Sequence, residues 1–281
     1  MLGLSLSTTS SQRRGPIVID FTRSAPLTWF TRSSNGTAQD VAGQVMTFGP
    51  DVPRMTDRGL LLEPSGTNVQ VESDQASVWV GEGNTITEDA ALAPNGYMDA
   101  DRVQLHGPGV AYIYRVSDPI PQSTAITCSF WAKAVSAPHK IGLRSGQTGV
   151  TSNRTVTTDW QRFSWTIMSS AVSDTEVFQI TNNSLVGGGV AAIVDVHVWG
   201  FQVEIGSVAT SYIHTDTGSV TRDADEAYLD FPVSTYSRVT FTWEGGQESL
   251  TMSENNNATG VLLGGSQSWV GSYLQRITIE R

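Results

Sequence analysis

Three side chains in one short segment have the types and the spacing of a sugar-binding site. In residues 194–199, valines alternate with Asp195, His197 and Trp199, so an extended strand would place these three on one face. A carboxylate and an imidazole can hydrogen-bond sugar hydroxyls, and an indole ring can stack on the face of a sugar. We interpret Asp195, His197 and Trp199 as candidate carbohydrate-binding residues. The alternative for Asp195 and His197 is a structural hydrogen bond within the protein.

The direction of the Trp199 ring depends on the glycine that follows it. The alternation reverses after Gly200, because Phe201 and Val203 become the apolar positions. A β-bulge at Trp199 and Gly200 would explain this reversal, and bulges often re-aim side chains beside binding sites. The sequence therefore predicts a bulge here and leaves the direction of Trp199 open.

A second candidate ring is Trp131, in a segment where polar and apolar residues alternate. One face would carry Ile126, Cys128 and Phe130, and the other face Thr127, Ser129, Trp131 and Lys133. On a polar face Trp131 would be a carbohydrate-binding platform for a sugar ring. The alternative is that a loop or the N-terminal segment covers it. On the apolar face, Cys128 is expected to be a buried, unreactive thiol.

Acidic residues gather after position 220, and they are the other group that could do chemistry. They are Asp223, Asp225, Glu226 and Asp230. Their oxygens suit calcium, but their spacing is not that of an EF-hand, and a solvated acidic linker is the simpler interpretation. Motifs for a serine nucleophile, a zinc site or a phosphate-binding loop are absent from the sequence. We predict no catalytic residues, although glycoside hydrolysis needs only two facing carboxylates, a pattern that the sequence leaves open.

The elements that would position these side chains are β-strands. Apolar residues recur at every second position, and turn residues interrupt them roughly every 8–12 residues. Residues 17–21, 110–116 and 163–167 are examples. No window of comparable length shows the spacing of an amphipathic helix without a glycine or proline. The sequence therefore predicts an all-β protein.

We expect three regions along the chain. Residues 1–60, rich in proline and glycine, are expected to form a loop-rich docking or anchoring region. Residues 61–222 hold the densest strand pattern and are expected to form the main domain. Residues 223–281 are expected to be an acidic linker and two β-hairpins, which would complete a sheet or pack on the main domain because isolated hairpins are marginal.

The charge of the chain limits its partners. Its 17 basic and 27 acidic residues give a formal net charge of −10, which repels nucleic-acid backbones, so we expect no nucleic-acid partner. No run approaches the ~18 apolar residues that span a bilayer, so we expect no membrane insertion. The first residues do not have the pattern of a secretion signal. A protein made in the cytoplasm is the expectation.

Three sets of short motifs, in order along residues 19–225, resemble a widespread group of phage and prophage structural proteins. The first set resembles the opening of tail-fibre and related virion proteins: residues 19–23 (IDFTR), 51–54 (DVPR), 59–64 (GLLLEP) and 67–68 (TN). The second is similar to strands of jelly-roll carbohydrate-binding modules: residues 130–134 (FWAKA) and 158–163 (TDWQRF). The third follows the pattern of the same group: residues 199–204 (WGFQVE), 210–213 (TSYI) and 220–225 (VTRDAD). His214 departs from it, standing where the group usually has proline.

The resemblance implies an antiparallel β-sandwich of jelly-roll type on the surface of a phage or gene-transfer-agent particle made in a bacterium. As a tail-fibre or head-spike component, the protein would attach to a host cell-surface glycan and to other particle proteins. A homo-oligomer follows by family analogy alone. Jelly-roll modules often carry a structural calcium ion, for which Glu72, Asp74 and Asp195 are loose candidates.

Two other functions stay open at the level of sequence. The protein could be purely architectural, for example a spike base, an adaptor or a decoration, with Trp131 and Trp199 buried at subunit contacts. It could also be a capsule-degrading glycoside hydrolase. Our hypothesis is a particle-surface adhesin whose β-sandwich binds host polysaccharide.

Overall fold

The computed structural model describes residues 15–23, 27, 29–107, 109–145, 152–182, 193–230, 238–251, 260–263 and 271–280. Regular structure in this part of the chain consists of β-strands and one short 3-10 turn, η1 (Ala76–Val78). Among the described residues, no helix has the length and apolar character needed to cross a membrane. The predicted all-β class is confirmed.

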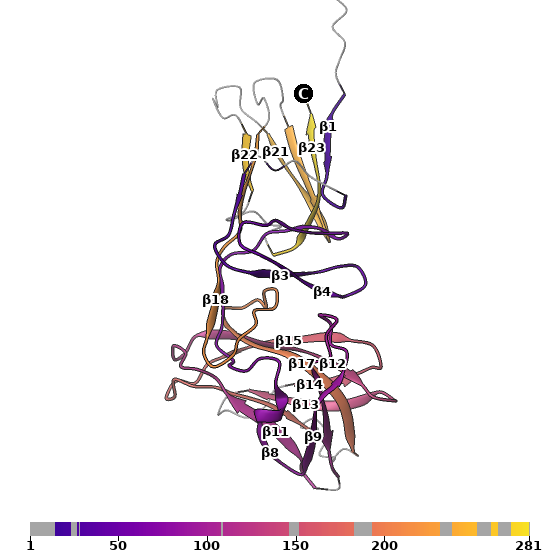
Figure 1. Cartoon of the computed structure of the whole chain (residues 1–281). Helices are drawn as coiled ribbons and strands as arrows, with labels where there is room; N and C mark the ends of the chain where they lie inside the picture. Colours follow the sequence, from indigo (N-terminus) through magenta and orange to yellow (C-terminus); the bar gives the residue numbers. More distant parts are fainter. Residues whose placement is uncertain are drawn as a thin grey trace, which may run out of the picture.

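Two antiparallel sheets face each other and form a jelly-roll β-sandwich, drawn in the lower part of Figure 1. The first sheet has the order β15 (Gln161–Met168), β12 (Ala125–Ala134), β17 (Val194–Ile205), β10 (Ala100–Leu105) and β9 (Asn84–Ala91). Two short strands extend it beside β17: β7 (Gly66–Asn68) and β18 (Val220–Arg222). The second sheet has the order β14 (Ser152–Val156), β13 (His139–Ser145), β16 (Val177–Thr181), β11 (Tyr112–Val116) and β8 (Val80–Glu82).

The core of the sandwich is built from alternate residues of its strands, as the alternation predicts. Its members include Val194, Val196 and Val198 of β17 and Ile126, Cys128 and Phe130 of β12. The Phe130 ring stacks on the Phe201 ring with a centroid distance of 5.7 Å, and Trp79 packs on the Phe201 ring at 4.1 Å. Each large apolar side chain removed from water contributes about 1.5–3 kcal/mol. The inner faces are thereby fixed, and the polar positions must face outward.

The predicted bulge at Gly200 is confirmed by the pairing of β12 with β17. Ser129 lies opposite Gln202, but Trp131 lies opposite Trp199, so β17 contains one extra residue. Gly200 has a φ of +68°, and a Cβ atom there would come within 2.8 Å of the Trp131 ring. Because of this bulge, Trp199 stays on the outer face beside Trp131, while Phe201, two residues further on, enters the core.

A smaller pair of sheets stands above the sandwich in Figure 1. One sheet has the order β21 (Gly246–Thr251), β20 (Arg238–Trp243), β23 (Tyr273–Glu280), β6 (Gly59–Leu61) and β5 (Arg54–Thr56), and β1 (Ile17–Asp20) also pairs with β23. The other has the order β2 (Trp29–Thr31), β19 (Glu226–Asp230) and β22 (Gly260–Leu263). Phe241 and Ile277 of the first sheet share a buried core with Ala227 and Leu263 of the second.

The pairing of these strands corrects two expectations. The hairpin of β20 and β21 is confirmed, but the second expected hairpin is wrong, because β22 pairs with β19 whereas β23 pairs with β20, β1 and β6. The first 60 residues also contribute strands to the same sheet as the C-terminal residues. Apolar alternation identifies strands but not their distant partners. The division of the chain into the regions 1–60, 61–222 and 223–281 stays a prediction.

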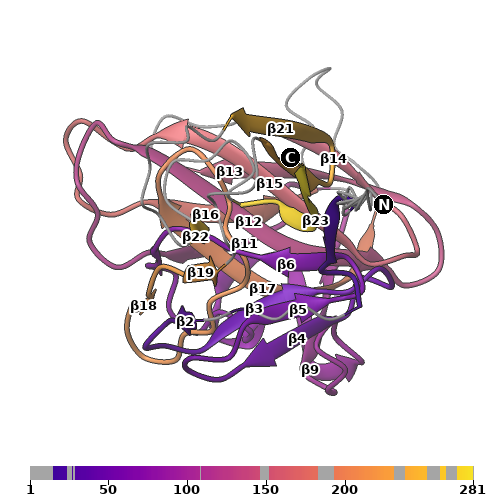
Figure 2. The same cartoon turned by 90° about the horizontal axis from the view of Figure 1, so that it is seen from above.

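A hairpin of β3 (Gly36–Gln39) and β4 (Val45–Phe48) lies between the small sheets and the sandwich (Figure 1). Seen from above in Figure 2, β3 and β4 cross over strands of the sandwich. Val45 of β4 belongs to one buried cluster with Trp131, Trp199 and Tyr212. The hairpin therefore covers part of the outer face of the seven-stranded sheet.

A buried network of charges joins the hairpin region, the sandwich and the small sheets. Asp225 pairs with Arg32 at 2.8 Å and also with Arg54, while Arg54 pairs with Glu63 at 2.7 Å. Arg222 lies 3.4 Å from Glu63. The expectation that Asp225 belongs to a solvated linker is wrong, because three arginines surround it below the surface. Asp223 and Glu226 are exposed, and the side chain of Asp230 lies outside the described residues.

The motifs that resemble phage proteins supply this network. Arg54 belongs to the 51–54 motif, Glu63 to the 59–64 motif, and Arg222 and Asp225 to the 220–225 motif. Burial alone would raise the pKa of Glu63, but Arg54 and Arg222 lower it below its usual value. These motif residues hold the parts of the fold together, so their role here is architectural.

Candidate functional site

Three hollows in the described part of the chain lie beside the β3–β4 hairpin. A cavity of about 500 Å³, which we call the hairpin cavity, lies between β3, β4, β17, β18 and the segments 95–99 and 212–214. A second cavity, of about 750 Å³, lies at the turn of the hairpin against β12 and β15. A smaller one of about 170 Å³ shares Val45 and Tyr212 with the first and Trp131 with the second. The three cavities follow one another along the hairpin.

The two tryptophans predicted as sugar platforms are buried. Trp131 is 2% exposed and Trp199 is 1% exposed, with ring centroids 5.3 Å apart. Tyr212 covers Trp199 at 4.5 Å, and Val45 of the hairpin packs on the same cluster. The expectation that Trp131 forms an open platform is wrong for this structure, because the N-terminal hairpin covers it. Trp199 lines the hairpin cavity and Trp131 lines the other two, although both are buried.

Asp195 and His197 lie on the outer face of β17, as the alternation predicts. Asp195 receives two hydrogen bonds from Arg102, at 2.8 and 2.6 Å, and these bonds lower its pKa. His197 lies opposite Lys133 on one side and Arg102 on the other. Neither residue lines the cavities that the structure describes. Asp195 therefore makes hydrogen bonds within the protein, which was the alternative to a glycan role. A glycan role for Asp195 or His197 stays a prediction.

The three loose calcium candidates do not converge on one point. Glu72 pairs with Arg115, Asp74 pairs with His214, and Asp195 pairs with Arg102. Among the described residues, no three His, Cys, Asp or Glu side chains are grouped closely enough to hold a metal ion. Glu72, Asp74 and Asp195 therefore do not form one calcium site, because each carboxylate faces a different basic side chain.

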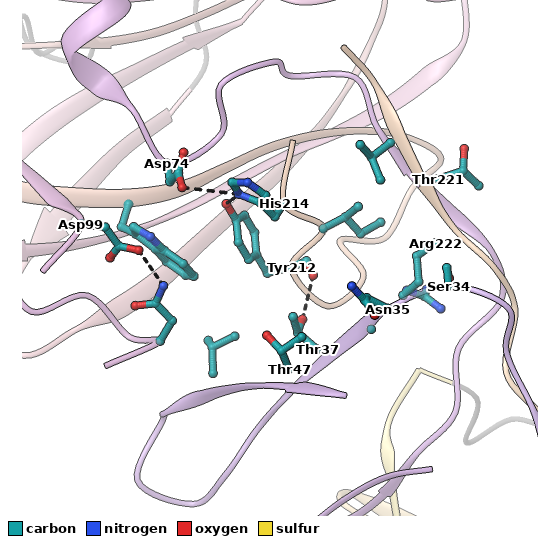
Figure 3. Close-up of a pocket in the computed structure, with 16 residues that line it drawn as sticks. Ser34, Asn35, Thr37, Thr47, Asp74, Asp99, Tyr212, His214, Thr221 and Arg222 are labelled. Carbon is teal, nitrogen blue, oxygen red and sulfur yellow. Dashed lines mark hydrogen bonds and ion pairs between the residues drawn. The ribbon is translucent and has the colours of Figure 1, made fainter. Parts of the chain in front are cut away.

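The hairpin cavity combines carboxylates, hydroxyls and rings, and Figure 3 shows how they lie. Asp74, Asp99 and His214 stand at one end of the cavity. Its remaining labelled lining residues are Ser34, Asn35, Thr37, Thr47, Tyr212, Thr221 and Arg222. His214 Nδ1 lies 3.4 Å from Asp74 Oδ2, and the amide of Asn95 donates to Asp99 Oδ2 at 2.7 Å. Most of the lining residues carry a polar group, but the surface that they present to the cavity is mainly apolar.

Three polar atoms of this lining are left without a partner. Asp74 Oδ1, Asp99 Oδ1 and the indole Nε1 of Trp199 are buried, and none has a hydrogen-bond partner among the described residues. Buried polar atoms in native proteins are normally paired, and unpaired ones need an explanation such as a bound molecule. The residues that carry these atoms all line the hairpin cavity, and a sugar has both the donors and the acceptors that the three atoms lack.

The electrostatics of the hairpin cavity depend on burial. Burial raises the pKa of Asp74, and His214 offsets this effect only in part, while the nearby Asp99 raises the pKa further. Burial also raises the pKa of Tyr212 well above its ordinary value. Burial therefore keeps the Tyr212 hydroxyl neutral, and its hydrogen bond of 2.7 Å with the Ser73 hydroxyl holds it in place.

Sequence reasoning missed most of the residues that line the hairpin cavity. Asp99 and Asn95 lie in a turn-rich segment between β9 and β10, where nothing in the alternation marks a site. Tyr212 belongs to the 210–213 motif, and His214 follows it as a departure from the usual proline. That departure is the one signal that could have drawn attention here. Asp74 was singled out by sequence, but for calcium.

No family model matches the chain, and no curated protein matches its sequence. Solved structures with a similar fold include the enzymatically active domain of bacteriophage CBA120 tailspike protein 4, at 11% identity and a TM-score of 0.36, covering 50% of this chain. The match spans 21% of that tailspike chain, so this protein covers about a fifth of its length.

Two further structural neighbours are carbohydrate-binding modules. The CBM22-1 xylan-binding domain from Paenibacillus barcinonensis is 14% identical with a TM-score of 0.35, covering 51% of this chain and 94% of that one. A family 11 module from Clostridium thermocellum, in complex with a mixed-linked tetrasaccharide, is 13% identical with a TM-score of 0.33, covering 51% and 97%. At these values the likenesses carry no argument about a ligand, and the site must be judged by its own residues.

Proposed function

We propose that this protein binds a polysaccharide in the hairpin cavity. The observation that carries the proposal is the set of unpaired buried atoms there, Asp74 Oδ1, Asp99 Oδ1 and Trp199 Nε1. Sugars present hydroxyl groups that both donate and accept hydrogen bonds, together with apolar ring faces that suit aromatic side chains. The cavity volume of about 500 Å³ suits one or two sugar rings, since small-molecule sites measure about 300–1,000 Å³.

We further propose that the protein acts on the surface of a phage-like particle, as a fibre or spike component that attaches the particle to a host glycan. The motifs in residues 19–225 support this part. Many copies on one particle would give avidity, so a modest affinity at each cavity suffices. The small sheets, at the end of the molecule opposite the sandwich (Figure 1), would then be the part that contacts other particle proteins.

Binding to a glycan array tests the proposal. We expect the protein to bind at least one bacterial surface polysaccharide. Asp74→Asn and Asp99→Asn should each weaken that binding about tenfold, the loss expected when one charged acceptor is removed. The matched control is Asp174→Asn, because Asp174 is exposed and lies outside the cavities that the structure describes. If no polysaccharide binds, or if both cavity variants bind like the control, the proposal is wrong.

The architectural alternative has one observation in its favour. Trp131 and Trp199, the predicted sugar platforms, are covered by the hairpin of the same chain. Purified protein that binds particles but no glycan would support this alternative. The hydrolase alternative would require the two carboxylates Asp74 and Asp99 to act on a bound sugar, and release of reducing ends from the bound polysaccharide would reveal it.

A further inference from the structure

The second cavity differs from the hairpin cavity in the charge of its lining. We call it the cationic cavity, because its walls carry the ammonium group of Lys133 and the guanidinium group of Arg162. The rings of Trp131 and Trp160 lie beside them, and the turn of the hairpin closes one side. In a chain of net charge −10 with two lysines, a gathering of cations in a cavity is unexpected from composition.

Neither cation has an ion-pair partner among the described residues. Lys133 Nζ lies over the Trp160 ring at 4.9 Å, and the Arg162 guanidinium lies over the Trp131 ring at 4.4 Å. Arg162 donates one hydrogen bond to the Ser129 hydroxyl at 3.0 Å, while its Nε is buried without a partner. The carboxylate that lines the same cavity, Asp159, is exposed and forms no ion pair with either cation.

The arginines of the charge network behave differently. Arg32, Arg54 and Arg222 are buried, but each lies within 4 Å of a carboxylate. Lys133 and Arg162 are half-buried at the wall of the cavity, and neither has a carboxylate partner of this kind in the part of the chain that the structure describes. Both side chains can therefore meet an anion that enters the cavity, with a charge-assisted hydrogen bond from each.

The neighbouring strand shows the effect of this positive charge. Lys133 lies opposite His197 of β17, and His197 lies opposite Arg102 of β10. Burial lowers the pKa of His197, and the charges of Lys133 and Arg102 lower it further. The outer face of the sheet is thus positive beside the cavity, which favours an anion there.

We propose that the cationic cavity binds the carboxylate of an acidic sugar residue, so that the polysaccharide ligand is a uronate-containing one. A planar guanidinium matches the geometry of a carboxylate, and an ammonium adds a second charge-assisted contact. The Trp160 ring supplies an apolar surface for the sugar ring. This inference rests on the proposed function, because the two cavities would hold neighbouring parts of one glycan chain along the hairpin.

The test compares glucuronate- and galacturonate-containing oligosaccharides with the same oligosaccharides after reduction of their carboxyl groups, by titration calorimetry. We expect the uronate forms to bind about tenfold more tightly than the reduced forms, as for one charge-assisted hydrogen bond. Lys133→Gln should reduce that difference, because the variant keeps only one of the two cations that line the cavity. Lys140→Gln is the matched control, because Lys140 is the other lysine and is exposed on β13.

Two outcomes would overturn the inference in distinguishable ways. If the reduced forms bind as tightly as the uronate forms, or if Lys133→Gln leaves the preference unchanged, the cationic cavity does not recognise a carboxylate, but the proposed function stands. If neither form binds and the glycan array is also negative, the proposed function fails with it. Because Arg162 also donates to Ser129 and packs on the Trp131 ring, Arg162→Gln is informative only if its thermal unfolding matches that of the unsubstituted protein.

Discussion

The charged residues of the outer sheet face differ in how many of their atoms are already paired. Both carboxylate oxygens of Asp195 accept hydrogen bonds from Arg102, whereas Asp74 and Asp99 each have one buried oxygen without a partner. A carboxylate that is fully used within the protein has little capacity left for sugar hydroxyls, and one with an unpaired oxygen needs a further donor. All three residues are aspartates, so this distinction appears only once their partners are known.

Replacing Asp195 tests the assignment of a structural role at the scale of one residue. We expect Asp195→Asn to cost about 0.2–1 kcal/mol of unfolding free energy, because its pair with Arg102 is partly exposed. Glycan binding should stay unchanged. A double-mutant cycle with Arg102→Gln in urea unfolding measures the pair. If Asp195→Asn weakened glycan binding as much as Asp74→Asn does, Asp195 would be a glycan-binding residue and its assigned structural role would be wrong.

At the scale of elements, the strands and the bulge of the sandwich follow from alternation, but the cover over Trp131 does not. Alternating valines and the reversal after Gly200 fix both faces of β17, and both were predictable. Of the residues in β3 and β4, Val45 is the one that belongs to the buried tryptophan cluster, beside Tyr212 and Ala93 from other segments. One apolar residue has no periodicity, and contacts between distant segments leave no local trace. The exposed aromatic site was therefore mispredicted.

The bulge predicts a specific sensitivity at Gly200. Its φ of +68° is unfavourable for other residues, and a Cβ atom would stand 2.8 Å from the Trp131 ring. We expect Gly200→Ala to lower the unfolding free energy by about 1–3 kcal/mol. It should also shift tryptophan fluorescence, since Trp131 must move. Chemical denaturation measures the first effect.

The control for this substitution is Gly218→Ala. A Cβ atom at Gly218 would meet nothing within 4 Å, and its backbone is not in the left-handed region. We expect a change within about 0.5 kcal/mol there. Equal effects at the two positions would contradict the account of the bulge and leave the position of Trp199 unexplained.

At the scale of the whole molecule, the buried charges replace a continuous apolar core. The sandwich and the small sheets have separate apolar cores, and Arg32, Arg54, Arg222, Glu63 and Asp225 lie between them. Sequence resemblance singled out the segments that contain most of these residues, but not their pairing. The reason is that the ion pairs join residues up to 193 positions apart. From the sequence alone, an isolated arginine or aspartate is expected to be at the surface.

The network should make the stability of the molecule depend on pH through Glu63. Arg54 and Arg222 lower the pKa of Glu63 in the folded protein, so the folded state binds its proton less readily than the unfolded chain. The stabilisation is complete above the ordinary value of 4.5 and is lost as the pH falls through the lowered pKa. Acid should therefore weaken the junction between the two cores.

Glu63→Gln isolates this contribution, because glutamine keeps the shape of the side chain and removes the charge that Arg54 requires. We expect a loss of about 3–5 kcal/mol at neutral pH, as for one partner removed from a buried pair. The difference in unfolding free energy between the variant and the unsubstituted protein should become smaller below pH 4.5. Glu63 is then protonated in the unsubstituted protein, which loses the same charge. Thermal unfolding across pH measures this difference, with the exposed Glu88→Gln as the control. A difference that stays constant in acid would mean that the loss comes from the hydrogen bonds that Glu63 accepts from Ser211 and not from its charge, and that Asp225 balances the arginines there.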